Sequence, residues 1–305
     1  MKTTTLILIG FSLAFSARAQ VVPPATPLFG KTLEEYSVEF MRFNFSLSTN
    51  QDPVHLLAGS LGEPVYFIAL DMFGAPGQEK VFTVPENAYV LYPIVVGWAD
   101  NVDTDPRFTV EALRGFLAEF FDSIIAIDGA IDDQPIPNLL DHRVNTPVFT
   151  FDFQNPDNLY SRIYSRDFLG AVDPIVADGY WVMAEPLPVG RHDLTYQYTL
   201  LPPLGSQPLA VFHFDVVPVP PSEWVRDLAN VLHRLETTGF EVRTLLQSLA
   251  GAQAHFEAGR MAQGIRRLTV FQRHVEHRLA SGHAGLAEDL SSYAERIKQR
   301  TLQEP

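Results

Sequence analysis

A cluster of prolines, Pro218, Pro220 and Pro221, divides the chain into two regions with different residue patterns. Before the cluster lie nearly all of the prolines and most of the aromatic residues, whereas the only proline after it is Pro305. Proline has no backbone N–H and favours extended, stiff chain, so a strand is not expected to run through the cluster. We therefore predict a β domain over residues 20–217, a linker over 218–222 and a helical domain over 223–303.

The first region has the pattern of β-strands. Residues 62–73, 81–98 and 147–153 are rich in Val, Ile, Tyr and Phe and are broken by Gly, Pro and Asn. Residues 124–131 look like a further strand that enters an Asp-Gly turn. One helix is expected after Thr109, which can cap it. Antiparallel strands with one inserted helix predict an α+β fold built on a β-sandwich of jelly-roll or immunoglobulin-like type.

The stretch from Asp178 to Leu200 predicts two strands joined by a turn. Pro-Leu-Pro-x-Gly at 186–190 is the expected turn, and it would set the register of a hairpin. Residues 192–200 then alternate strictly, as a half-buried strand requires. The face expected to point inward holds His192, Leu194, Tyr196, Tyr198 and Leu200.

The second region has the spacing of amphipathic helices. Four apolar stripes occur, over residues 224–235, 242–256, 261–279 and 286–297. The first three are followed by Gly239, Gly259 and Gly282, where a helix end favours a left-handed residue. Short connections between such helices predict a small antiparallel bundle.

The N-terminus has the features of a secretory signal peptide over residues 1–19. Lys2 is followed by an apolar run from Leu6 to Phe15 and by Ala17-Arg18-Ala19, a small-x-small cleavage pattern. The run is too short to span a membrane, which takes about 20 residues. We expect a soluble, secreted or periplasmic protein without a membrane span. Because the chain has no cysteine, disulfides, thiolate catalysis and cysteine metal sites are excluded.

Charge is distributed unevenly between the two regions. Residues 20–221 hold nine Lys and Arg against 26 Asp and Glu, a net charge of −17, whereas residues 222–305 have a net charge of +1. An acidic first region disfavours nucleic acid and anionic membrane surfaces as partners. A solvated basic helix face that could dock on the acidic region is formed by Arg266, Arg267, Arg273, His274, His277 and Arg278.

Three segments of the first region resemble the ordered motifs of a group of secreted bacterial and archaeal proteins without an assigned activity. The segments are GEPVYFIAL, VPENAYVLYPIVVGWADN and DGYWVMAEPLPVGRHDL, and the resemblance covers about residues 33–217. The last motif, D-G-Y-W followed by P-L-x-x-G-x-H, is the distinctive one. Members often carry a cysteine pair, which this chain lacks, and Asn87 stands where glycine is usual. A role for a disulfide therefore does not carry over.

The C-terminal segment LLQSLAGAQAHFEAGRMAQGIRRLTVFQRHVEHRLASG resembles the FIMAH-type helical domain found at the ends of diverse exported bacterial proteins. The match is to a leucine-rich helix, a turn and then a Leu-Phe-Val-Leu stripe. This resemblance implies an accessory module and brings no catalytic residue with it.

The segment WADNVDTDP offers a candidate calcium site. Calcium takes several oxygen ligands from a compact loop, and the candidates here are Asp100, Asn101, Asp103 and Asp105. The spacing is not that of an EF-hand. These acids also precede an expected helix, where negative charge is favoured anyway.

The D-G-Y-W motif and the histidine after it are a candidate ligand-binding site, made of Asp178, Tyr180, Trp181 and His192. The alternative is structural: His192 lies on the expected apolar face as a hydrogen-bonded histidine, and aromatic residues of strands are usually core. His213 and Asp215 could form an acid/base pair, although a cross-strand partner is the more usual role.

The sequence therefore favours an exported, non-catalytic binding or surface-interaction protein, whose ligand is a protein, a polysaccharide or calcium. No other cofactor is implied. The alternative is a secreted, glycan-directed hydrolase that uses acidic residues of the β domain, since two converging carboxylates would suffice for that chemistry.

Overall fold

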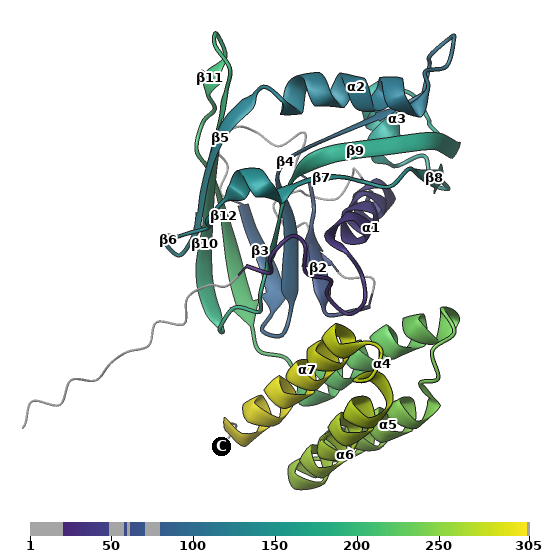
Figure 1. The fold of residues 1–305 in the computed structure, drawn as a ribbon, viewed down its shortest axis with the longest axis vertical. Helices are drawn as coiled ribbons and strands as arrows, with labels where there is room; N and C mark the ends of the chain where they lie inside the picture. Colours follow the sequence, from purple (N-terminus) through teal and green to yellow (C-terminus); the bar gives the residue numbers. More distant parts are fainter. Residues whose placement is uncertain (1–20, 49–57, 60–61, 71–79, 304–305) are drawn as a thin grey trace, which may run out of the picture.

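The computed structural model describes residues 21–48, 58–59, 62–70 and 80–303 (Figure 1). The predicted signal peptide, residues 1–19, lies outside these residues. Within the described part of the chain, no helix is both long enough and apolar enough to cross a membrane. The described residues form two β-sheets and seven α-helices, four of which follow the last strand.

Sheet 1 has the strand order β1-β2-β4-β9-β7, with β8 also paired to β9. Its strands are β1 (Ala58–Gly59), β2 (Val65–Ile68), β4 (Tyr89–Asp100), β7 (Arg143–Asn145), β8 (Phe149–Phe153) and β9 (Gly170–Ala184). Most pairs are antiparallel, as predicted, but β2 and β4 run parallel, which corrects the all-antiparallel expectation. A parallel pair joins segments that no hairpin can connect, so local sequence does not reveal it.

Sheet 2 has the order β3-β12-β10-β5-β6, with β11 also paired to β10. Its strands are β3 (Lys80–Pro85), β5 (Ile124–Ile131), β6 (Gln134–Pro135), β10 (Gly190–Leu200), β11 (Gly205–Ser206) and β12 (Ala210–Val217). Here β3 and β12 are the parallel pair. The predicted Asp128-Gly129 turn is wrong, because both residues lie within β5; the turn is made by Asp132 and Asp133, whose φ values are 49° and 60°.

The two sheets pack face to face, and one of them is buried on both sides. One core lies between the sheets and includes Tyr92 and Val182 of sheet 1 and Phe214 of sheet 2. The other face of sheet 1 is covered by α1 (Leu33–Ser46), which packs Phe40 against Trp181. Residues 175–184 of β9 are accordingly buried without a break.

Among the described residues, the β part contains three α-helices where the sequence predicts one. The expected helix is present as α2 (Val110–Phe121), and the side chain of Thr109 caps it by accepting from the N–H of Ala112. The additional helices are α1 and α3 (Leu159–Tyr164). For α1 a local signal existed, since Thr32 and Glu35 form a capping box. Its many Phe and Tyr residues, which favour strands, mask that signal.

The predicted hairpin over residues 178–200 is not formed. β9 lies in sheet 1 and β10 in sheet 2, so the proline-rich segment between them carries the chain from one sheet to the other. Two prolines, Pro186 and Pro188, have no N–H for a strand ladder. Leu187 between them is buried in the core between the sheets. The predicted alternation of β10 is confirmed, with Leu194 and Leu200 buried.

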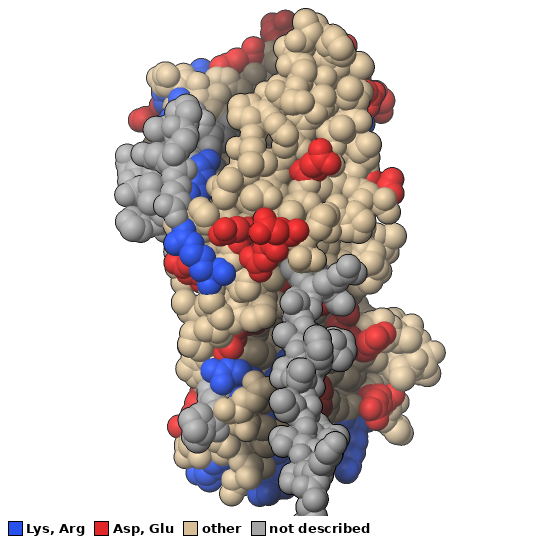
Figure 2. All heavy atoms as spheres, turned by 90° about the vertical axis from the view of Figure 1, so that its left-hand side faces the viewer, with Lys and Arg blue, Asp and Glu red and all other residues tan. Residues whose placement is uncertain are grey.

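The outward face of sheet 2 is only sparsely charged. Figure 2 shows the side of the molecule on which sheet 2 lies, and its broad upper surface carries few Asp, Glu, Lys or Arg side chains. On β10 this face presents Asp193, Thr195, Gln197 and Thr199, the polar half of the alternation, of which only Asp193 is charged.

The helical part confirms the predicted bundle closely. Its helices are α4 (Pro221–Thr237), α5 (Arg243–Glu257), α6 (Met261–Leu279) and α7 (Ala284–Gln303). Gly239 and Gly259 adopt the expected left-handed conformation, with φ of 94° and 69°. Gly282 does not, so the prediction for that residue is wrong.

The helical part docks on the β part through α4 and α7. Phe29, from the segment before α1, packs edge-on against Tyr293 of α7 and Tyr89 of β4. Around this apolar contact, Arg234 of α4 binds Glu63 at 2.6 Å and Arg300 of α7 binds Glu86 at 2.9 Å. The core under α1 continues into the bundle across this interface.

Basic side chains of the helical part do pair with acidic residues of the β part, but they do not belong to the predicted basic face, which lies on α6. The helix that carries the basic face, α6, packs against α5 and α7 and lies away from the β part (Figure 1). Among the described residues, the ion pairs between the two parts come from α4 and α7. Buried apolar surface decides which helices dock, because charge on an exposed face contributes little.

Candidate functional site

Asp178 of the D-G-Y-W motif is buried in an ion pair. Its side chain is 1% exposed, and Arg143 of β7 donates to both of its oxygens, through Nε at 3.0 Å and Nη2 at 2.7 Å. Arg143 also binds Asp122 at the end of α2. The pairing register brings these residues together, because Asn145, two residues from Arg143, lies opposite Asp178. The motif aspartate therefore fastens β7 and α2 to β9.

The remaining residues of the motif have packing roles. A Cβ atom on Gly179 would lie 2.6 Å from the carbonyl oxygen of Val95, where β4 has an irregular register, so only glycine fits. Tyr180 faces sheet 2 and is 4% exposed. Trp181 faces α1 and is fully buried. None of the three presents a side chain to solvent as a ligand-binding residue would.

His192 lies in the other sheet and is held by two hydrogen bonds. Its Nδ1 is 2.6 Å from Asp132, and its Nε2 is 2.8 Å from the carbonyl oxygen of Pro188. This is the structural histidine that the alternation indicates. His213 pairs across the strands with Asp193 at 2.6 Å, as the register of β10 and β12 places them directly opposite. Asp178 and His192 are thus not brought into one site.

Three of the four candidate calcium ligands, Asp100, Asn101 and Asp103, are engaged within the protein. Asp100 accepts from the N–H of Val102 and from the hydroxyl of Tyr160. Asn101 accepts from the N–H of Phe108 and so closes the loop before α2. Asp103 pairs with Arg166 at 2.6 Å. In the described ranges, no three carboxylate or imidazole groups gather as a metal site would require.

An aromatic cleft, which the sequence did not predict, is lined by residues of β4, α2 and α3 and of the loop before α2. These elements lie at the end of the molecule opposite the bundle (Figure 1). The cleft has a volume of about 330 Å³ and opens to solvent between the end of β4, α2 and α3. Its wall contains five aromatic rings and one carboxylate, those of Trp98, Phe108, Phe116, Tyr160, Tyr164 and Asp100. Pockets with apolar walls and a few fixed polar groups are the usual form of a ligand site.

The polar groups of the aromatic cleft are ordered by their contacts. Burial and the neighbouring carboxylate of Asp100 raise the pKa of Tyr160, so its hydroxyl stays protonated and donates to Asp100. A carboxylate can accept about four hydrogen bonds, and Asp100 here accepts one on each oxygen. Asp100 can therefore accept a further hydrogen bond from a hydroxyl group of a ligand.

Several aromatic residues of this end are exposed rather than core. Phe108 is 41% and Phe116 50% exposed, and their rings meet edge to face at 5.0 Å. Helical spacing gives α2 an apolar stripe of Val110, Leu113, Leu117, Phe120 and Phe121, yet Phe120 is 40% exposed. The sequence did contain a signal for this exposure. The α2 segment has more apolar residues than one buried face needs, and Phe116 lies outside the apolar stripe.

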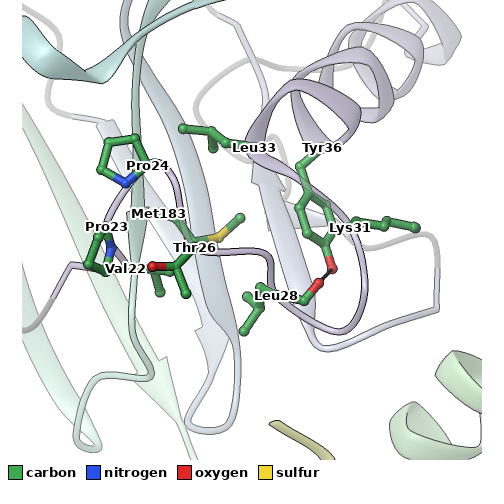
Figure 3. Close-up of a pocket in the computed structure, with 9 residues that line it drawn as sticks. All are labelled: Val22, Pro23, Pro24, Thr26, Leu28, Lys31, Leu33, Tyr36 and Met183. Carbon is green, nitrogen blue, oxygen red and sulfur yellow. Dashed lines mark hydrogen bonds between the residues drawn. The ribbon is translucent and has the colours of Figure 1, made fainter. Parts of the chain in front are cut away.

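A much smaller cavity lies where the segment before α1 crosses β9 (Figure 3). Tyr36 closes one side by donating to the carbonyl oxygen of Leu28 at 3.0 Å, and Met183 lines the opposite side. Its volume is about 10 Å³, which is about that of one water-sized probe. It is too small for a sugar ring or a peptide side chain and is a packing gap.

A scan against protein-family models finds no match to the chain, and no curated protein or solved structure matches it. The two resemblances seen in the sequence therefore stay predictions. Function has to be argued from the geometry of the aromatic cleft.

Proposed function

We propose that this is an exported, non-catalytic binding protein that holds a neutral carbohydrate in the aromatic cleft. The observation that carries the proposal is the combination of exposed and half-buried rings around one carboxylate with free acceptor capacity, Asp100. The C–H groups on the face of a sugar ring pack well on aromatic faces, whose electron density attracts them. The hydroxyl groups at the ring edge then need acceptors such as a carboxylate.

Charge favours a neutral ligand over an anionic one. The region that forms the cleft has a net charge of −17, and Asp105 is in the same loop as the cleft residue Val102. An anionic polysaccharide would approach against this field, which at moderate salt acts over about 8–10 Å.

The alternative of a glycan-directed hydrolase finds less support. Such enzymes flank the bond with two carboxyl groups, roughly 5–10 Å apart. Of the described residues that line the cleft, Asp100 is the only one with a carboxylate. One acceptor suits binding, whereas general acid/base cleavage needs a second group.

Calorimetry with soluble cello-, malto- and chito-oligosaccharides tests the proposal, with oligogalacturonate as the anionic comparison. Phe116→Ala should weaken the binding of the recognised sugar about tenfold, or about 1.4 kcal/mol. Phe120→Ala is the matched control, because Phe120 is on the same helix, is similarly exposed and does not line the cleft. Equal losses in both variants, or binding of none of the sugars, would contradict the proposal.

Fluorescence gives an independent readout of the same site. The chain has three tryptophans, of which Trp181 and Trp224 are 0% and 4% exposed. Trp98 alone lines the cleft. A bound sugar should therefore change the emission of the wild type, and Trp98→Phe should abolish the change.

A further inference from the structure

The basic face of α6 has no acidic partner within the described part of the molecule. Its arginines Arg266, Arg267, Arg273 and Arg278 are exposed, and among the described residues none of them forms an ion pair. The arginine and lysine residues of the helical part that do form ion pairs lie on α4 and α7, and they are Arg226, Arg234, Lys298 and Arg300. Four guanidinium groups are therefore available to a partner from outside.

Positive charge in the helical part is concentrated on α5 and α6. Residues 243–280 hold six Arg against two Glu, a net charge of +4, whereas α4 and α7 together hold five Lys and Arg against six Asp and Glu. Figure 2 shows Lys and Arg side chains along the lower edge of the molecule, at the end formed by the bundle. A helix is about 10 Å across and the Debye length is about 8–10 Å, so α4 and α7 separate this charge from the acidic β part.

The cations of α6 form two adjacent rows along the helix, opposite its buried stripe. The members of a row are seven and then four residues apart, which keeps them on one side of a helix and makes each row about 16 Å long. One row contains Arg266, Arg273 and His277, and the other contains Arg267, His274 and Arg278. Donors in a line of this length fit a chain that repeats its anionic group.

The neighbouring helix α5 leaves the basic face open. A Cβ atom on Gly251 would lie 3.4 Å from the side chain of Arg267, so this arginine lies against a stretch of α5 that has no side chain. The one acidic residue of α5 is Glu257, its last residue, which accepts from Gln253 at 2.9 Å. No carboxylate of α5 therefore neutralises the basic face.

The turn between α5 and α6 adds a further donor to this surface. Arg260 donates through Nε to Nδ1 of His255 at 2.9 Å, so the proton of the neutral imidazole is on Nε2. Desolvation and the charges of Arg260, Arg267 and Arg266 lower the pKa of the imidazole, which keeps it neutral near pH 7. Three guanidinium groups thus act on one imidazole, and the positive charge at this end is strong.

The use of arginine points to carboxylates as the anionic groups. Residues 243–280 contain no lysine. The guanidinium fork donates two parallel hydrogen bonds to one carboxylate, whereas an ammonium group acts as a point charge. A single-stranded nucleic acid would need aromatic side chains on which its bases stack. The only Phe, Tyr or Trp residues of α5 and α6 are Phe256 and Phe271, and both are buried.

We propose that the basic face of α6 binds an acidic polysaccharide of the polyuronate class, in which the sugar units carry carboxylates. Arg266, Arg267, Arg273 and Arg278 donate to carboxylates of successive sugar units, so the polymer lies along α6. The line of cations, the choice of arginine and the lack of internal partners all match this class of polymer. The surface is independent of the aromatic cleft, which lies at the other end of the molecule (Figure 1).

A solvated face that only keeps the protein soluble is the alternative role of these arginines. Oligogalacturonate and its methyl ester separate the two roles, since they share a backbone and differ in the charge of the carboxylates. Calorimetry of the full chain in 50 mM salt should give a Kd of about 0.1 mM for oligogalacturonate, at least tenfold tighter than for the methyl ester. Raising the salt to 200 mM should weaken binding at least about tenfold.

Paired substitutions on α6 and elsewhere in the bundle locate the binding surface. Arg267→Gln combined with Arg278→Gln should weaken oligogalacturonate about tenfold. Arg226→Gln combined with Lys298→Gln removes the same charge from α4 and α7 and should leave binding within twofold. Lysine in place of Arg267 and Arg278 keeps the charge and should retain binding within threefold. Thermal unfolding shows that each variant is folded.

The proposal is overturned if oligogalacturonate does not bind or if the methyl ester binds equally well. It is also overturned if the folded α6 glutamine variant binds as the wild type does. Tighter binding of a short DNA duplex would assign the face to nucleic acid, and salt-sensitive dimers without sugar binding would assign it to a second copy. Phe116→Ala should leave oligogalacturonate binding unchanged, so failure here is distinct from failure of the carbohydrate proposal.

Discussion

The β part and the helical part of the molecule bury their charged side chains in different places. In the β part the ion pair of Asp178 and Arg143 lies inside, under α2. In the helical part the buried carboxylate is Asp227, which lies at the interface and accepts from Asn87 of the β part. The most buried carboxylate therefore lies in the interior of the β part, whereas in the helical part it lies at the interface.

The helices of the two parts also begin differently. In the β part, α1, α2 and α3 are capped by the side chains of Thr32, Thr109 and Asn158. The N-caps of α4, α5 and α6 make no such side-chain bond. Helices that lie on a sheet are held at their ends, whereas those of the bundle are held by apolar stripes along their length.

The largest expected effect concerns Arg143. Arg143→Met leaves the Asp178 carboxylate buried without its partner, and we expect unfolding free energy to fall by roughly 3–5 kcal/mol in urea titrations. Arg234→Met at the interface should cost less, about 1–3 kcal/mol, because Glu63 keeps its contact with Lys31 at 3.2 Å. Equal losses of unfolding free energy in the two variants would show that the ion pairs of the interior and of the interface contribute equally to stability.

Acid should strengthen the interface. Burial raises the pKa of Asp227 to about 6, so its protonated form is favoured in the folded protein. Its stabilising contribution is complete below about pH 4 and is lost as pH rises through about 6, a change of up to about 3 kcal/mol. Unfolding free energies measured from pH 4.5 to 7.5 should fall, and Asp227→Asn should flatten that dependence.

Asp289 provides the comparison for this pH effect. Its pKa is also raised to about 6 by burial, but it is half-buried and accepts from the N–H of Phe29. Because its pKa is raised to the same value, Asp289→Asn should remove a comparable share of the slope. If neither variant alters the pH dependence, the interface is not its source.

Gly179→Ala tests the close approach of β9 and β4. Its Cβ would overlap the carbonyl oxygen of Val95, so we expect a loss of about 1–3 kcal/mol. Gly115→Ala is the control: Gly115 is inside α2 and a Cβ there meets nothing within 4 Å. That change should raise stability by about 0.5–1 kcal/mol. A neutral Gly179→Ala protein would mean that the two strands can separate locally without cost.

The smallest effect is expected at a helix cap. Thr109→Ala removes the acceptor for the Ala112 N–H and should cost about 1 kcal/mol in thermal or urea unfolding. Thr109→Ser keeps the acceptor and should change stability much less. The same loss in both variants would assign the effect to the methyl group instead of the cap.

Prediction succeeded where structure depends on residues near one another in the chain. The helix after Thr109, the four helices of the bundle and the alternation from His192 to Leu200 follow from spacings of two to four residues, and all are present. The role of His192 as a hydrogen-bonded histidine also followed from that alternation.

Prediction failed where partners lie far apart. Arg143 and Asp178 are 35 residues apart, and Phe116 and Tyr160 meet at the cleft although 44 positions separate them. The D-G-Y-W motif was distinctive in sequence, yet its distinctiveness reflects a buried ion pair and a close strand contact. Residues of α2 and α3, which belong to no distinctive sequence motif, form the better candidate site.

The sequence by itself determined the division at the proline cluster, the helical nature of the second part and which face of β10 points inward. These depend on backbone geometry and local periodicity, which each segment carries with it. Only the tertiary structure decided that β9 and β10 belong to different sheets, that α4 and α7 form the interface, and that aromatic side chains gather in a cleft. Those outcomes depend on which buried surfaces fit together in space, and a one-dimensional spacing contains no measure of that fit.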